Sequence, residues 1–201
     1  MNELRLVFAV VASVLSGFAF YFYAKQVKLG QSKPNIATWS ISVFLMLLNT
    51  LTFQDMSKDK VATLQLVVGF AGAVIVFFYA LVKGKFSRPK PTELLSLLFG
   101  VCAGVVWYVF RQAASANMII LLALLVALYP TWKAVYQNPF SDTPRSWVMW
   151  STAYSITTVN ILLGMSNPDW HAVSLINPVV GVVAHGLVAF LSRENRKLQF
   201  Q

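Results

Sequence analysis

Seven long apolar runs, joined by short polar connections, constrain this chain more than any other feature. A helix needs about 20 apolar residues to cross the hydrocarbon core of a bilayer. Runs of about that length are expected as helices at 4–24, 36–54, 61–82, 93–110, 117–137, 145–165 and 170–192. The first run ends in the bulky aromatic stretch Phe18–Tyr23, unlike the small residues of a signal-peptide cleavage site. The sequence therefore predicts an all-α membrane protein with seven transmembrane helices, the first of them retained.

The composition excludes several other classes of protein. Hydrophobic residues make up 57% of the chain and charged residues 11%, whereas charged residues reach about a quarter in soluble domains. The net charge of +9 comes from short basic clusters between the apolar runs, so we expect no nucleic-acid partner. One cysteine, Cys102, and two widely separated histidines predict no metal-ligand cluster, and no Ser–His–acid set suggests catalysis. We therefore expect neither a cofactor nor an enzyme.

The distribution of basic residues predicts the orientation. The connections on one side carry twelve Lys and Arg, and those on the other side carry four, which are Arg5, Lys58, Lys60 and Arg111. The positive-inside rule then places the amino terminus outside and the carboxyl terminus in the cytoplasm. The basic cytoplasmic loops, above all Lys83–Lys90, offer contacts to anionic lipid headgroups. The short loops fit an integral protein of a bacterial inner (plasma) membrane.

An internal repeat relates the two halves of the chain. With an offset of 108 residues, the stripe Trp39, Ser42, Met46 and Thr50 falls on Trp147, Trp150, Tyr154 and Thr158. This spacing places each set on one face of a helix. The single span between the halves makes the repeats parallel, related by an axis along the membrane normal. We expect a 3+1+3 arrangement, with a first triple-helix repeat at 1–82, a linker helix at 83–116 and a second triple-helix repeat at 117–201.

Two stretches of the second half resemble the SWEET and PQ-loop superfamily. Tyr129-Pro130-Thr131-Trp132-Lys133, followed by 138–144, is similar to the Pro-Gln turn, basic residues and small-residue loop of that superfamily. Asp169, followed by Ile176-Asn177-Pro178 and Gly181, resembles the last SWEET helix, which carries a Pro-Asn pair shortly before a Gly. The chain differs at Ala24, where the first repeat of the family has Pro. The resemblance implies the 3+1+3 fold with an outer amino terminus, in a superfamily that handles sugars, amino acids, vitamins and sorting signals.

Uncharged polar side chains within the expected spans mark the candidate binding site. No Asp or Glu lies in the middle of a span, which favours a carrier without a coupling ion. Amides and hydroxyls, together with aromatic rings, suit a small neutral hydroxylated ligand. The proposed substrate-binding residues are Asn177, Asn49, Thr158, Tyr154 and Trp107. The same polar groups also commonly act as hydrogen-bond partners between membrane helices.

His185 lies about seven residues from the inner end of the last expected span, which leaves two interpretations open. We expect a neutral imidazole that is hydrogen-bonded to a neighbouring helix. The alternative is a proton relay or a substrate contact.

Tryptophans and prolines supply the candidate gates and hinges. Trp39 and Trp147 are expected near the inner face, either as a symmetric gate or as part of an aromatic belt. The candidate hinges are Pro34, Pro130, Pro144 and Pro178, although a proline at such a position also simply starts a helix. Gly100 and Gly104 form a small-residue seam, suited to joining the two repeats or to forming a homo-oligomer.

The sequence therefore favours a facilitative, uncoupled membrane transporter of a small neutral polar solute, such as a sugar, that works by alternating access. The alternative is a non-transporting PQ-loop-type membrane receptor, or a subunit or scaffold of a complex. In that case the basic stretch Lys83–Lys90 would hold a partner.

Overall fold

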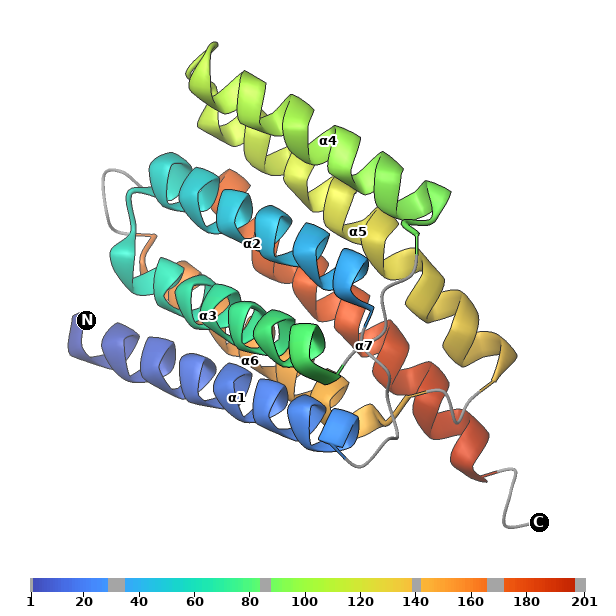
Figure 1. Ribbon diagram of the computed structural model, residues 1–201. Helices are drawn as coiled ribbons and strands as arrows, with labels where there is room; N and C mark the ends of the chain where they lie inside the picture. The colour runs from blue at the N-terminus through green and yellow to red at the C-terminus, as the bar shows by residue number, and fades with distance from the viewer. Residues whose placement is uncertain (1, 29–34, 84–87, 139–141, 166–171, 198–201) are drawn as a thin grey trace.

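The computed structural model describes residues 2–28, 35–83, 88–138, 142–165 and 172–197 (Figure 1). Regular structure in these ranges is helical, and the expected all-α architecture is confirmed. The helices are α1 (Asn2–Lys28), α2 (Ile36–Ser57), α3 (Lys60–Lys83), α4 (Pro91–Tyr108), α5 (Ala113–Gln137), α6 (Pro144–Leu163) and α7 (Ile176–Lys197). A short 3-10 helix, η2 (Ala172–Leu175), leads directly into α7.

Six helical segments are long and apolar enough to cross a membrane, which indicates an integral membrane protein. They are α1 to α5 and the segment Ala172–Ser192. The seventh expected span, α6, is the exception among the described helices, because much of its buried face is polar. Ser146, Thr157 and Asn160 are buried there beside two tryptophans.

Local chemistry explains where the helices begin and end. Asn35 precedes α2, and its side-chain oxygen accepts a hydrogen bond from the Ala37 N–H at 3.1 Å. Lys58 closes α2 in the left-handed conformation, with φ 53°. Asp59 then caps α3 through its carboxylate, so the turn from α2 to α3 takes only two residues. Pro91 occupies the first position of α4, where its missing N–H costs no hydrogen bond.

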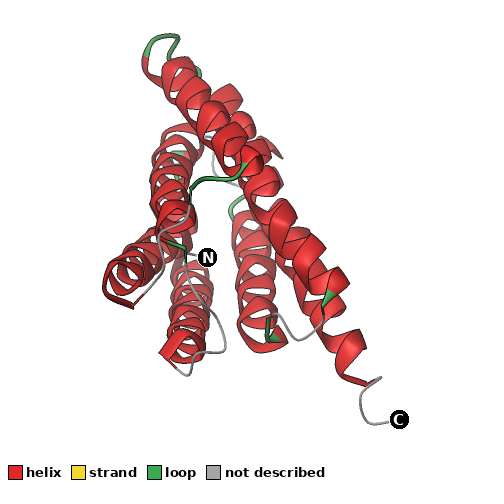
Figure 2. Cartoon of the chain, turned by 45° about the vertical axis from the view of Figure 1, so that its right-hand side comes forward, coloured by secondary structure: helices red, strands yellow, loops and turns green. Residues whose placement is uncertain are grey.

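Contacts between the helices follow a regular pattern (Figures 1 and 2). The helix α3 contacts both α1 and α2, and α7 contacts both α5 and α6. In addition, α1 packs along α6 and α2 packs along α5. The helix α4 lies mainly against α5 and touches α2. Because the helices alternate in direction, α1 begins where α2 and α6 end; we call this the Arg5 end of the bundle, and the opposite one the Asp142 end.

Glycines allow two of these pairs to approach closely. A Cβ at Gly72 of α3 would lie 2.3 Å from Cδ2 of Phe20, a ring of α1 that meets Trp150 at 4.9 Å between centroids. A Cβ at Gly100 of α4 would lie 2.6 Å from Cδ2 of Leu45 on α2. The glycine seam expected on α4 therefore packs against another helix of the same chain.

We expect Gly72→Ala to lower the free energy of unfolding by about 1–3 kcal/mol, because the added methyl group overlaps the Phe20 ring and displaces it from its edge-to-face contact with Trp150. Titration with sodium dodecyl sulfate in mixed micelles measures this quantity. Gly104→Ala is the matched control, since its Cβ would meet Leu48 at 3.9 Å, an ordinary contact. Equal effects of the two substitutions would contradict the close α1–α3 packing.

Candidate functional site

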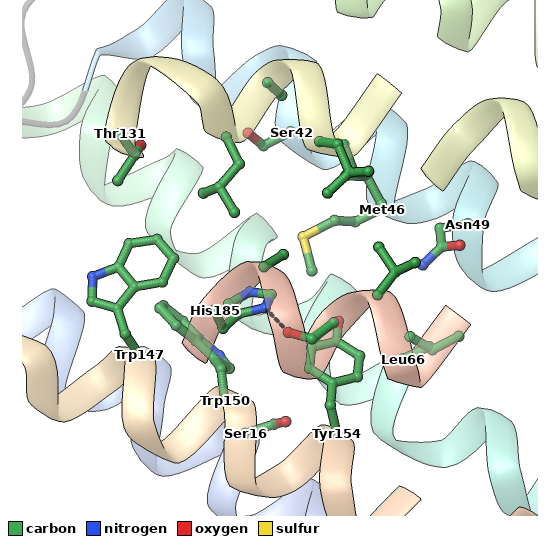
Figure 3. Close-up of a pocket in the computed structure, with 18 of the residues that line it drawn as sticks. Ser16, Ser42, Met46, Asn49, Leu66, Thr131, Trp147, Trp150, Tyr154 and His185 are labelled. Atoms are coloured by element: carbon green, nitrogen blue, oxygen red, sulfur yellow. Dashed lines mark hydrogen bonds between the residues drawn. The ribbon is translucent and has the colours of Figure 1, made fainter. Parts of the chain in front are cut away.

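A cavity of about 260 Å³ lies between the helices, and residues of α1, α2, α3, α5, α6 and α7 line it (Figure 3). It begins near the middle of the bundle, beside the amides of Asn49 and Asn177. From there it extends to Trp39, Asp142 and Trp147 at the Asp142 end. Both expected substrate-binding amides, Asn49 and Asn177, and both expected gate tryptophans therefore line the same cavity.

Three buried amides form a cluster at the deep end of this cavity. Asn177 donates from Nδ2 to Oδ1 of Asn49 at 2.7 Å, and Asn117 donates to the same oxygen at 3.0 Å. Asn117 also donates to Oγ1 of Thr52 at 2.9 Å. Two donors on one oxygen fix the orientation of the Asn49 amide, whose nitrogen faces the cavity (Figure 3). The cluster joins α2, α5 and α7.

The amide cluster leaves one donor and one acceptor free. Neither Nδ2 of Asn49 nor Oδ1 of Asn177 has a hydrogen-bond partner among the described residues. Both side chains line the cavity. Because polar groups buried in a membrane protein need partners, these two atoms are suited to bind a ligand group that both accepts and donates, such as a hydroxyl.

Aromatic side chains of α6 form one wall of the cavity around His185. Trp147, Trp150 and Tyr154 lie on one face of α6, and their ring centroids are 5.6, 5.7 and 5.2 Å from the His185 ring (Figure 3). His185 Nδ1 lies 2.8 Å from the Gly181 carbonyl oxygen of its own helix, not of a neighbouring helix as expected. Because a carbonyl oxygen can only accept a hydrogen bond, Nδ1 carries the hydrogen and Nε2 of the neutral ring is an acceptor.

The opposite wall at the Asp142 end also carries rings. Tyr23 of α1 lies 5.4 Å from Trp39 of α2 and 6.3 Å from Trp150 between centroids. Trp39 and Trp147, the pair that the repeat predicts as a gate, both line the cavity here. A gate at the Asp142 end requires side chains that line the cavity there, and both tryptophans do so.

Two expected binding residues lie elsewhere. The Thr158 hydroxyl donates to the Tyr154 carbonyl of its own helix at 2.9 Å, and the residue is not part of the cavity wall. Trp107 donates from Nε1 to Asp55 at 2.9 Å, near the Arg5 end, and it packs against the α2–α4–α5 core. The internal repeat placed Thr158 on a helix that does line the cavity, but the cavity wall on α6 reaches only as far as Tyr154.

The four candidate hinge prolines differ in their surroundings. Pro130 lies inside α5, next to Thr131 of the cavity wall. Pro144 begins α6, and Pro178 is the third residue of α7, where helix N–H groups are unpaired in any case. The short 3-10 helix η2 lies just before α7 on the N-terminal side of Pro178. Pro34 lies outside the described residues.

A second polar network, not anticipated from the sequence, crosses the middle of the bundle. Gln65 of α3 donates to Ser16 of α1 at 3.3 Å and accepts from Thr157 of α6 at 2.7 Å. Ser16 and Gln65 line the cavity. The signal available in the sequence was an isolated glutamine within the apolar run 61–82.

The Arg5 end of the bundle is closed by a buried charge cluster. Arg5, expected in a connection, is 7% exposed and forms an ion pair with Asp59. Its Nε donates to both the backbone and the side-chain oxygen of Asn160 at 3.1 Å, and the Asn160 amide donates back to the Arg5 carbonyl at 3.0 Å. We call Arg5, Asp59 and Asn160 the Arg5 latch. It holds the first turns of α1 and α3 to the last turns of α6.

Asp142 is the acidic residue of the cavity wall, at the other end. It is half-buried, and burial raises the pKa of its carboxyl above the usual value. A hydrogen bond from the Thr143 N–H, at 2.7 Å, opposes that rise. The nearby indole N–H of Trp147 also opposes the rise in the pKa of Asp142. It makes no hydrogen bond of normal geometry among the described residues. No ion pair to Asp142 occurs in those residues.

We expect Arg5→Met to lower the free energy of unfolding by about 3 kcal/mol, because the Asp59 and Asn160 oxygens lose their buried partner. The methionine keeps the apolar stem, and unfolding in mixed micelles is the measurement. Arg111→Met is the control, because Arg111 is exposed, covers the Tyr108 ring at 5.2 Å and forms no ion pair among the described residues. A similar small change in both variants would show that the Arg5 latch contributes little.

We expect Asp142→Asn to raise the melting temperature in detergent at pH 7. The raised folded-state pKa means that the folded protein binds more protons than the unfolded chain, so stability falls as pH rises from about 3.8 through that pKa. The gain of the variant must therefore disappear at acidic pH, where Asp142 is protonated in both states. A gain that does not depend on pH would contradict the burial of a charged carboxylate.

Comparisons of the chain with protein-family models, with curated proteins and with solved structures find no match. What the cavity can bind therefore follows from its own side chains.

Proposed function

We propose that this chain is a facilitative, uncoupled membrane carrier of a small polar solute such as a sugar or another hydroxylated molecule. The observation that carries the proposal is the free donor of Asn49 beside the free acceptor of Asn177, in a cavity walled by aromatic rings. Uncharged hydroxyls match this donor–acceptor pair, and rings stack on the apolar faces of such solutes. The cavity volume of about 260 Å³ suits a solute of modest size.

The pattern of helix contacts supports the 3+1+3 arrangement. If α1, α2 and α3 correspond to α5, α6 and α7, each contact in the first set has a counterpart in the second. The helix α3 sits between α1 and α2 as α7 sits between α5 and α6. The contacts between the two sets, α1 with α6 and α2 with α5, are also equivalent. We therefore propose two parallel triple-helix units joined by α4, as the resemblance to the SWEET and PQ-loop superfamily implies.

In this proposal the cavity lies between the two units, and the ends of the bundle open in turn. The Arg5 latch joins α1 and α3 of one unit to α6 of the other. Opening that end requires the latch to separate. At the opposite end, Trp39 and Trp147 come from equivalent positions of the two units and would meet when the cavity closes there. The positive-inside rule assigns the Asp142 end to the cytoplasm.

Uptake of radiolabelled solutes into proteoliposomes tests the proposal. We expect saturable flux of at least one solute in a panel of sugars, amino acids, amino alcohols and vitamins, without an imposed ion gradient. A complete absence of flux would favour the receptor or scaffold function.

Asn177→Ala removes the free acceptor and one partner of Asn49, while Asn117 still satisfies the Asn49 oxygen. We expect the initial rate of uptake to fall by about tenfold or more, because one buried hydrogen bond to the solute is lost and Asn49 shifts. Thr158→Ala is the matched control, since this hydroxyl bonds only its own helix, and it should transport normally. Loss of stability in Asn177→Ala with unchanged transport per folded molecule would identify the amides as structural.

A further inference from the structure

The charges along the cavity wall indicate the charge of the solute, if the chain is the carrier proposed above. Asp142 is the acidic residue in the described wall, and no Lys or Arg contributes to that wall. A carboxylate taken out of water without an ion pair is costly unless a ligand supplies the missing positive charge. The chain as a whole has a net charge of +9, so this wall differs in sign from the rest of the molecule.

Aromatic faces surround the same end of the cavity. Trp147 meets Trp150 at 5.2 Å and Tyr23 meets Trp39 at 5.4 Å between centroids, and all four rings line the wall. Faces of Trp and Tyr attract ammonium groups through the negative charge above the ring, and Trp is the strongest of them. A pocket that combines several such faces with one carboxylate suits a cation and offers little to an anion.

The remaining free polar atoms favour the same kind of solute. Nε2 of His185 is an acceptor when Nδ1 donates to Gly181, and Oδ1 of Asn177 is a second acceptor. Beyond them, the amide nitrogen of Asn49 supplies a donor at the deep end. The cavity therefore offers negative charge at the Asp142 end, an acceptor at His185, and a donor–acceptor pair for a hydroxyl at its deep end.

From this geometry we propose that the solute is a small hydroxylated organic cation, with its ammonium group between Asp142 and the tryptophans and its hydroxyl directed along the cavity towards Nε2 of His185. The sequence alone favoured a neutral solute, because it placed Asp142 in an inner connection outside the spans. The cavity in fact reaches as far as this carboxylate.

Choline and its uncharged analogue, in which carbon replaces the quaternary nitrogen, are matched probes for this proposal. Equilibrium dialysis against the full-length protein in nanodiscs of phosphatidylglycerol, at pH 7 and low salt, measures the binding of each. We expect choline to bind at least tenfold more tightly than the analogue. Equal affinities, or no binding of choline, would overturn the cation proposal. Uptake of other solutes would in that case still support a carrier.

Asp142→Asn keeps the size of the side chain and removes its charge. We expect this variant to lose most of the preference for choline while it still binds the uncharged analogue as well as the unmodified protein does. Asp55→Asn is the control, because that carboxylate lies near the Arg5 end, bonded to Trp107 and Lys58, and is absent from the cavity wall. A preference that survives in Asp142→Asn would also overturn the proposal.

The headgroup of phosphatidylcholine carries the same ammonium group as choline. The choice of membrane lipid therefore distinguishes a free solute in the site from a lipid headgroup in the site. Phosphatidylglycerol contains no amine, so choline bound in those nanodiscs occupies the site as a free solute. We expect nanodiscs that contain phosphatidylcholine to give the same choline affinity. Complete loss of choline binding in them would show that the site holds a lipid headgroup and would contradict a soluble substrate.

Discussion

The requirement that polar groups inside a membrane find partners within the protein governs this structure. Water cannot satisfy them there, so each buried amide, hydroxyl or charge must be paired by a neighbouring helix. Two internal networks meet that requirement, one around Asn49 and Asn117 and one around Gln65. The hydroxyls of Ser13 and Ser146 are also unpartnered among the described residues, but they lie away from the cavity, whereas the free atoms of Asn49 and Asn177 border it. The candidate site is thus a place where unpaired polar atoms meet a space that a ligand can fill.

The two ends of the bundle are closed by different chemistry. At the Arg5 end, a guanidinium pairs with a carboxylate and an amide across three helices, and apolar residues such as Phe53 and Ile161 fill the space nearby. The opposite end has rings along a cavity and a carboxylate that forms no ion pair with any described residue. A fully satisfied ion pair resists opening, whereas aromatic side chains can change rotamer at little cost. This asymmetry favours a state in which the Arg5 end is shut and the Asp142 end is accessible.

The sequence predicts the helices well because the apolar runs and their polar connections report directly on the membrane. The expected span 36–54 became α2 at Ile36–Ser57, and 61–82 became α3 at Lys60–Lys83. Side-chain roles were harder to predict, because they depend on how helices rotate and pair. Trp107 bonds Asp55 instead of lining the cavity, and Arg5 is buried because Asp59 and Asn160 converge on it. Such convergence links residues far apart in sequence and leaves no local pattern.

The central claim is that one cavity becomes accessible from each side of the membrane in turn. Ser42 lines the cavity, and the described chain contains one cysteine, Cys102, which is exposed (Figure 3). A Ser42→Cys variant in a Cys102→Ser background, treated with a membrane-impermeant maleimide in right-side-out and inside-out vesicles, therefore reports accessibility directly. The account predicts modification from both sides. Modification from a single side, or from neither, would contradict it.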